Sequence, residues 1–80
     1  MTSILFYGKI SDRFGDTLDV NLPQNSLSVG ELRNFLSANY QFNEILDLTV
    51  RVTKNDEFVL ETEMLQSSDV VSFLSPFSGG

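Results

Sequence analysis

The chain has 80 residues, the length of one small domain, and 41% of them are hydrophobic, which argues against a disordered chain. It contains no cysteine and no histidine, so thiolate chemistry, disulfides, zinc fingers and imidazole acid–base catalysis are excluded. Its 11 acidic and 5 basic residues give a net charge of −6, which opposes binding to nucleic acid and suits a basic partner surface.

The N-terminal segment gives no sign of export or membrane insertion. Its apolar run extends only from Ile4 to Tyr7, which is too short for a signal peptide or a membrane span. We therefore expect a cytoplasmic protein without membrane contact, a location that the absence of cysteine permits.

The first quarter of the chain predicts a β-hairpin. Residues 3–10 predict a strand in which Ile4, Phe6 and Ile10 share one face, while Leu5, Tyr7 and Lys9 share the other. Residues 11–16 are rich in Asp, Gly and Ser and are expected to form the hairpin loop, with Gly15 free to take a positive φ. Residues 17–22 alternate strictly between polar and apolar and predict a half-buried strand, which Pro23 ends.

A single amphipathic helix is predicted next. Ser28 and Glu31 have the spacing of a capping box, which marks a helix start. The apolar stripe that follows at helical spacing comprises Val29, Leu32, Leu36 and Tyr40, widened by Phe35. We therefore assign Phe35, with Phe6 of the first strand, to the helix–sheet core. Residues 43–46 are expected to add a short helical turn.

Three more strands are predicted after the helix. In chain order they comprise residues 48–53, 58–60 and 70–74. The first two are joined by a turn at Asn55-Asp56. Met64 and Leu65 are the apolar residues of an otherwise polar segment and are expected to close one end of the core.

The order ββαβββ indicates a two-layer α+β domain, because one amphipathic helix can cover only one face of a sheet. By analogy, the compact solution with this order is the ubiquitin-like β-grasp. It has a mixed sheet of four to five strands on one main helix, with the first and last strands adjacent at the centre. The domain would comprise residues 1–75, followed by a tail over residues 76–80.

The tail ends in Gly79-Gly80. Without Cβ atoms, two glycines can enter a channel too narrow for other residues and present a terminal carboxylate to an active site. The alternative is an unstructured chain end with no role.

The residues that precede the two glycines favour a functional role for the tail. The ending Phe-x-x-Pro-x-x-Gly-Gly comprises Phe73, Pro76, Gly79 and Gly80. In this ending the chain resembles the MoaD/ThiS group of ubiquitin-like sulfur carriers, which includes the small subunit of molybdopterin synthase. The resemblance extends to the apolar first strand, Ile4 to Gly8, to the helix pattern Ser28-Val29-x-x-Leu32-Arg33-x-x-Leu36, and to Asn55 at a turn.

The chain departs from the family pattern at three places. Ser11 stands where an arginine is usual, with Arg13 nearby. The turn before the last strand is Ser67-Ser68-Asp69 in place of an acidic residue followed by Gly-Asp, and Ser75 replaces one of two paired prolines. These departures bear on partner contacts.

The resemblance implies a non-catalytic, sulfur-donating subunit of a transferase. An E1-like adenylyltransferase would consume ATP to adenylate the Gly80 carboxylate, and a sulfur donor system would convert it to a thiocarboxylate. The tail would then enter the large subunit of molybdopterin synthase, in an assembly of two small and two large subunits, and give sulfur to cyclic pyranopterin monophosphate for the molybdenum cofactor. The chain itself would bind no cofactor and no metal.

Three alternatives stay open. The chain could be the sulfur carrier of thiamine-thiazole synthesis, although those chains are usually shorter and lack room for residues 39–47. It could be a ubiquitin-like modifier that is joined to lysines through Gly80. It could also be a β-grasp interaction module with an accidental Gly-Gly.

Three large apolar residues fall on the sheet face opposite the helix. Tyr7, Phe58 and Leu74 have the parity of that face, which should otherwise be polar. With Pro76 and Phe77 of the tail, they form the predicted partner interface, in line with the family's use of this sheet face. The alternative is scattered surface hydrophobicity, which is common.

The polar residues offer no catalytic site. The densest acidic cluster comprises Asp56, Glu57, Glu61 and Glu63, and its spacing matches no calcium loop, so we read it as a solvated face. The serines have no histidine to activate them, so a catalytic triad is impossible.

Overall fold

The structure is a computed structural model that describes residues 1–41 and 43–76. Its main sheet has five strands in the order β2-β1-β7-β4-β5. The strands are β1 (Thr2–Tyr7), β2 (Thr17–Val20), β4 (Arg51–Lys54), β5 (Glu57–Phe58) and β7 (Val71–Leu74). β1 and β7 are parallel and every other neighbouring pair is antiparallel. The first and last strands are thus neighbours at the centre of a mixed sheet, as predicted.

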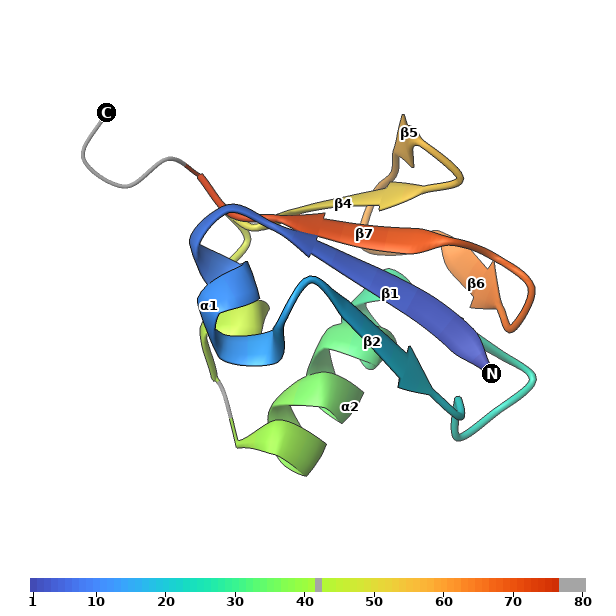
Figure 1. Cartoon of the computed structure of the whole chain (residues 1–80). Helices are drawn as coiled ribbons and strands as arrows, with labels where there is room; N and C mark the ends of the chain where they lie inside the picture. Colours follow the sequence, from blue (N-terminus) through green and yellow to red (C-terminus); the bar gives the residue numbers. More distant parts are fainter. Residues whose placement is uncertain (42, 77–80) are drawn as a thin grey trace.

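Helix α2 (Val29–Tyr40) lies across one face of this sheet, so the molecule has two layers (Figure 1). The core lies between them and is made of alternate strand residues and one side of the helix. From the sheet it includes Ile4, Phe6, Val52, Val71 and Phe73, and from the helix Val29, Leu32 and Leu36. The α+β prediction is therefore confirmed.

The helix begins where the capping box predicts. The Ser28 hydroxyl accepts the Glu31 N–H at 3.1 Å, and the Glu31 carboxylate accepts the Ser28 N–H at 2.8 Å. The buried side of the helix is narrower than the predicted stripe, because Tyr40 is 41% exposed and Phe35 is only half-buried. Phe35 packs against the edge of the core, whereas Tyr40, which the predicted stripe included, lies largely outside it.

The predicted strand and loop over residues 3–16 are partly wrong. The strand ends at Tyr7, and two short helical segments follow: η1 (Gly8–Ile10) and α1 (Ser11–Phe14). Gly8 has a φ of +82°, which turns the chain out of the strand, and Gly15 has the expected positive φ. Phe14 then stacks on the core residue Phe6 with ring centroids 4.6 Å apart. The apolar residues Ile10 and Phe14 are four positions apart, which is the spacing of one helix face. A search for strand-like alternation therefore does not detect this helical segment.

A second sheet was not predicted. It pairs β3 (Ser26–Ser28) with β6 (Met64–Gln66) in antiparallel fashion, with Leu27 opposite Leu65. Leu65 is buried, as expected for a residue that closes the core, but Met64 is 47% exposed, which contradicts its assignment.

The other boundaries shift by a few residues. The turn of η2 (Asn43–Leu46) is confirmed. The next strand begins at Arg51, because residues before it form a turn in which the Asp47 carboxylate accepts the backbone N–H and hydroxyl of Thr49 at 2.9 and 2.8 Å. The Asn55-Asp56 turn is confirmed and both residues have positive φ, while β5 covers 57–58 and not 58–60.

A buried arginine joins the helix to the segment that leads into β4. Arg33 is 3% exposed, and its guanidinium donates to the carbonyls of Ile45, Asp47 and Val50 at 2.6–3.1 Å. It also makes two hydrogen bonds to the Glu61 carboxylate at 2.8 and 2.9 Å. These contacts hold a stretch of irregular backbone that makes no sheet ladder.

Over the described ranges, no helix is both long and apolar enough to cross a bilayer.

Candidate functional site

The candidate site lies where the two central strands end. Leu74, the last residue of β7, is paired with Tyr7 of β1 on one side and with Arg51 of β4 on the other. The chain then continues through Ser75 to the exposed Pro76. The tail therefore starts from the middle of the sheet, at one end of it (Figure 1). The predicted site residues Phe77, Gly79 and Gly80 lie outside the described residues.

The predicted outer-face residues are where alternation puts them. Tyr7 is 52% exposed, Phe58 is 61% exposed and Leu74 is half-buried. Leu74 alternates with the buried Phe73, so its side chain is on the face that α2 does not cover. The Arg51 guanidinium lies 5.0 Å from the centroid of the Phe58 ring, on the same face. The positions of Tyr7, Phe58 and Leu74 on this face are confirmed, and their role as an interface stays a prediction.

A hollow of about 550 Å³ adjoins the start of the tail. Its lining includes the predicted residues Phe58, Leu74 and Pro76 and four that the sequence analysis did not assign to a site: Leu48, Thr49, Arg51 and Ser75. Leu48 is 67% exposed because the Asp47–Val50 turn precedes β4 and resets the alternation. Tyr7 is not among the lining residues. The structure therefore brings the outer-face side chains of β4, β5 and β7 together beside the tail.

The start of β7 is held by hydrogen bonds between two turns. The Asn55 side chain accepts the Val70 N–H at 3.0 Å and donates to the Asp69 carboxylate at 3.1 Å. The backbone N–H of Gln66 donates to the other Asp69 oxygen at 2.8 Å. The hydrogen bonds that the Asp69 carboxylate accepts, first from the Gln66 backbone and then from the Asn55 side chain, lower the pKa of Asp69 below its ordinary value of 3.8. The Asp69 carboxylate thus fixes the turn from which the tail-bearing strand departs.

A sequence model of the ThiS family matches residues 4–80. The chain belongs to the ThiS family. The recognition of a MoaD/ThiS-type, ubiquitin-like sulfur-carrier family is therefore confirmed, and members of this family work with partner enzymes.

Two solved structures share the fold of this ThiS-family chain. SAMP1 from Haloferax volcanii matches with a TM-score of 0.77 and 18% identity, over 99% of this chain and 98% of that one. A structure of the H. volcanii small archaeal modifier protein 1 matches with a TM-score of 0.69 and 15% identity, over 95% and 99% of the two chains. At these identities the likeness establishes the fold, a ubiquitin-like β-grasp.

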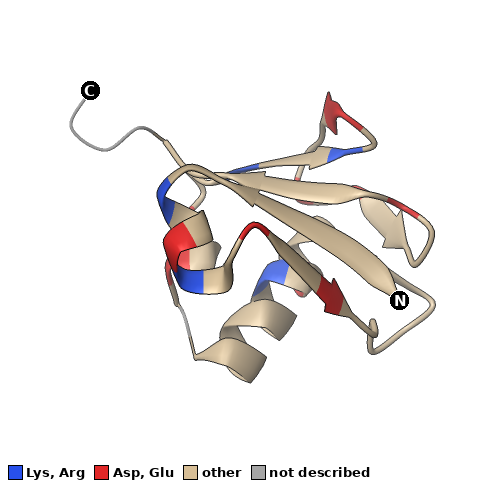
Figure 2. Ribbon diagram, viewed as in Figure 1, with Lys and Arg blue, Asp and Glu red and all other residues tan. Residues whose placement is uncertain are grey.

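The charged residues of the ThiS-family chain do not form a single patch. The basic residues fall in three places, near α1, on α2 and on β4 (Figure 2). The predicted acidic cluster is divided, because Glu61 pairs with Arg33 and Glu63 pairs with Lys54 at 2.9 Å. The hydrogen bond that the Lys54 ammonium donates to the Glu63 carboxylate raises the pKa of Lys54. Within residues 1–41 and 43–76, no group of three or more carboxylates could hold a metal ion.

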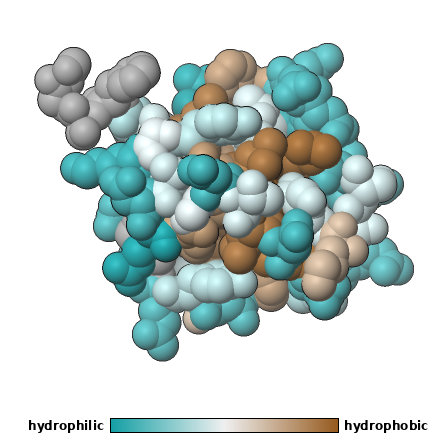
Figure 3. Space-filling view, viewed as in Figure 1, coloured by the Kyte–Doolittle hydropathy of each residue, from teal (hydrophilic) through white to brown (hydrophobic). Residues whose placement is uncertain are grey.

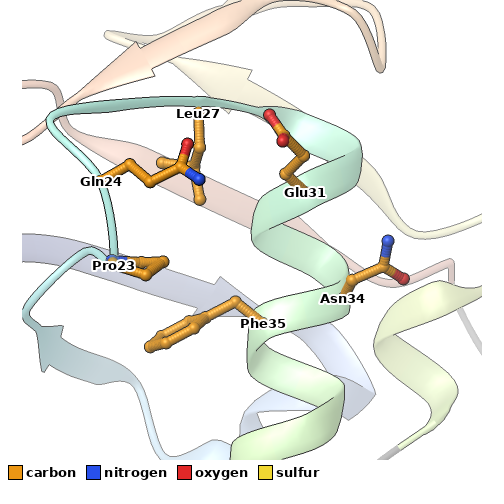
Figure 4. A pocket seen from close by; sticks show the side chains of 6 residues that line it. All are labelled: Pro23, Gln24, Leu27, Glu31, Asn34 and Phe35. Atoms are coloured by element: carbon orange, nitrogen blue, oxygen red, sulfur yellow. The ribbon is translucent and has the colours of Figure 1, made fainter.

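A second hollow, of about 320 Å³, lies away from the tail, between α2 and the loop that precedes β3. Pro23 and Phe35 lie on two sides of it, with Glu31 and Asn34 along the helix (Figure 4). Its lining contains none of the predicted site residues.

In the view of Figure 3, hydrophobic residues gather near the middle and mostly hydrophilic residues surround them.

Proposed function

We propose that this ThiS-family chain is a sulfur carrier, the small subunit of molybdopterin synthase. The observation that carries the proposal is the family match over residues 4–80, because it extends through Phe73, Pro76, Gly79 and Gly80 to the proposed reacting residue. The Gly80 carboxylate is the group that carries sulfur, and the catalytic groups come from partners.

The proposed chemistry has two activation steps. In the active site of an E1-like adenylyltransferase, a Gly80 carboxylate oxygen attacks the α-phosphorus of ATP, and pyrophosphate leaves. Sulfur from the donor system then adds to the carbonyl carbon, and AMP leaves with one of the former carboxylate oxygens. Activation is needed because a free carboxylate has no leaving group, whereas the acyl-adenylate has one. The product is a thiocarboxylate, whose sulfur is a soft nucleophile toward cyclic pyranopterin monophosphate.

The geometry at the end of β7 supports a protruding carrier arm. The described chain leaves the sheet at Ser75 and Pro76, and the four residues from Phe77 to Gly80 can extend at most about 14 Å. In the proposed complex the large subunit contacts the outer sheet face through Tyr7, Phe58 and Leu74, with Pro76 and Phe77 at its margin. The hollow beside Leu74 offers a place for an apolar side chain of that subunit.

The test is sulfur loading of Gly80 by the adenylating enzyme with ATP and sulfide, followed by intact mass spectrometry. The expected product gains the mass difference between sulfur and oxygen. A variant lacking Gly80 and a variant with one added residue should not support sulfur transfer, because the reacting carbon is displaced by about 3.5 Å. Circular dichroism checks that both variants stay folded. Normal loading and transfer by the untrimmed extended variant would contradict the proposal.

The second candidate is a ubiquitin-like modifier, since one of the two structural neighbours is named as small archaeal modifier protein 1. In that case the activated Gly80 carbonyl would be transferred to a lysine amine of a target protein. Conjugates in which Gly80 is linked to lysine would favour it. The sulfur carrier of thiamine-thiazole synthesis would share the thiocarboxylate, and association with a molybdopterin synthase large subunit separates it from our proposal.

A further inference from the structure

Ser75 ties the start of the tail to the end of β1. Its backbone N–H donates to the Tyr7 carbonyl at 3.0 Å and so extends the β1–β7 pairing by one residue. Its hydroxyl donates to the same carbonyl at 3.1 Å and accepts the backbone N–H of Ile10 at 3.0 Å. One side chain therefore connects β7, β1 and the helical segment that follows β1.

The backbone of Gly8 is in close contact with Ser75. A Cβ atom added to Gly8 would lie 2.6 Å from the Ser75 hydroxyl oxygen and 2.9 Å from its carbonyl oxygen. Gly8 also has a φ of +82°, which other residues adopt only with strain. The absence of a side chain at Gly8 thus leaves the space that the Ser75 hydroxyl occupies.

The bond to Ile10 also satisfies an amide at the start of a helical segment. The first N–H groups of a helix have no carbonyl four residues earlier within the helix to accept them. Ile10 is only 4% exposed. The Ser75 hydroxyl therefore supplies a hydrogen-bond acceptor for the backbone N–H of a buried residue. Removing the hydroxyl leaves this amide and the Tyr7 carbonyl each with one partner fewer.

We infer that Ser75 is a positioning residue for sulfur transfer, an inference that rests on the proposed function. The hydroxyl fixes where the arm from Pro76 to Gly80 begins, and therefore how far the Gly80 carbonyl carbon reaches into a partner's active site. Ser75 itself does not touch the reacting atoms. Because a misplacement of 1 Å can lower a rate by about a hundredfold, the anchor of so short an arm affects the chemistry.

The experiment compares Ser75→Ala and Ser75→Thr with the wild-type chain in sulfur loading by the adenylating enzyme with ATP and sulfide. We expect Ser75→Ala to lower kcat roughly tenfold and to leave KM within about twofold, because the exposed side chains of Tyr7, Phe58 and Pro76, which a partner can contact, are unchanged. Ser75→Thr retains the hydroxyl and should restore kcat to within about twofold of wild type. In Ser75→Ala, hydrogen exchange of the Ile10 amide should accelerate roughly tenfold.

Ser37→Ala is the matched control. The Ser37 hydroxyl also donates a hydrogen bond, to Asn43 at 2.9 Å, but this bond joins α2 to η2 and not β7 to β1. This variant should load at the wild-type rate even if its urea midpoint falls as far as that of Ser75→Ala.

Three results would overturn the inference and leave the proposed function intact: wild-type kcat in Ser75→Ala, an equal loss in Ser37→Ala, or no recovery in Ser75→Thr. Failure of the wild-type chain to load would instead overturn the proposed function, and the role of Ser75 with it.

Discussion

The guanidinium of Arg33 lies among backbone carbonyls beneath the sheet, 5.6 Å from the centroid of the Phe73 ring. A buried charge is costly unless it is paired and fully hydrogen-bonded. Here the Glu61 carboxylate neutralises the charge. The carbonyls of Ile45, Asp47 and Val50 accept hydrogen bonds from the remaining N–H groups of the guanidinium. The planar, multiply donating guanidinium suits this task, and a lysine amine would not.

Arg33→Met should therefore destabilise the domain by about 3 kcal/mol or more, since it leaves buried carbonyls unpaired. Urea unfolding measures the loss. Arg51→Met is the control, because Arg51 is exposed, and it should change stability by no more than about 0.5 kcal/mol. Equal midpoints for the two variants would show that the Arg33 contacts contribute nothing.

The two phenylalanines assigned to the core from the sequence should differ in their contributions. Phe6 is 2% exposed and stacks on Phe14 and Phe73, so Phe6→Ala should cost about 3–5 kcal/mol. Phe35 is half-buried at the rim of the second hollow, and Phe35→Ala should cost less, about 1–2 kcal/mol. Thermal or urea unfolding of both variants tests the order, and a larger loss for Phe35→Ala would contradict it.

At the scale of elements, the sequence predicted best where a pattern repeats. The capping box and the stripe of Val29, Leu32 and Leu36 located α2, and alternation placed the central strands on the correct face. β3 and β6 have three residues each, with a single buried residue apiece, so no period could appear. Their pairing depends on contacts between distant segments, which local patterns do not record.

The same limit applies to the candidate site. Alternation identified Tyr7, Phe58 and Leu74 on the outer face, because each belongs to a strand or lies at its end. It missed Leu48, since the turn that Asp47 stabilises interrupts the alternation before β4. It gave no hint that Ser75 contacts Ile10, because that bond joins residues 65 positions apart.

The Asp69 turn should make stability depend on pH. The pKa of Asp69 is lower in the folded chain than its ordinary value of 3.8, so its carboxylate stabilises the fold above that value. This contribution is lost as the pH falls through the folded pKa. Asp69→Asn should therefore be less stable than wild type near pH 7, and the difference should shrink between about pH 5 and about pH 2.

Urea midpoints of both proteins across this range measure the effect. The side chain is only partly buried, so the effect at neutral pH should not exceed about 1 kcal/mol. A difference between the two proteins that stays constant, or grows, on acidification would contradict the assignment of the effect to Asp69.

At the scale of the whole molecule, α2 covers one face of the sheet, and no helix of the described residues covers the other face (Figure 1). If that other face binds the large subunit, Phe58→Ala should weaken the complex by about 2 kcal/mol or more, roughly thirtyfold in Kd. The free domain should lose less than about 1 kcal/mol, because the Phe58 ring is 61% exposed. Leu60→Ala is the control: Leu60 is 77% exposed and does not line the hollow, so the affinity should not change.

Titration calorimetry against the large subunit, alongside urea unfolding, gives both quantities. Unchanged affinity combined with a clearly lower urea midpoint would place Phe58 in the core and leave the tail as the recognition element. An equal loss of affinity in Leu60→Ala would mean that the contribution to binding is not specific to the residues that line the hollow.

The parallel pairing of β1 with β7 has a consequence for protein synthesis. Among the strands that the structure describes, β1 leaves the ribosome first and β7 last, and the Ser75 hydroxyl meets the Tyr7 carbonyl across 68 positions. A nascent chain that lacks β7 has neither Val71 nor Phe73 to close its core. Translation that stops early therefore yields a chain that exposes apolar residues and is open to proteases. A folded molecule must therefore contain β7, the strand that directly precedes the tail, so a chain that stops before β7 would not present the folded domain to a partner enzyme.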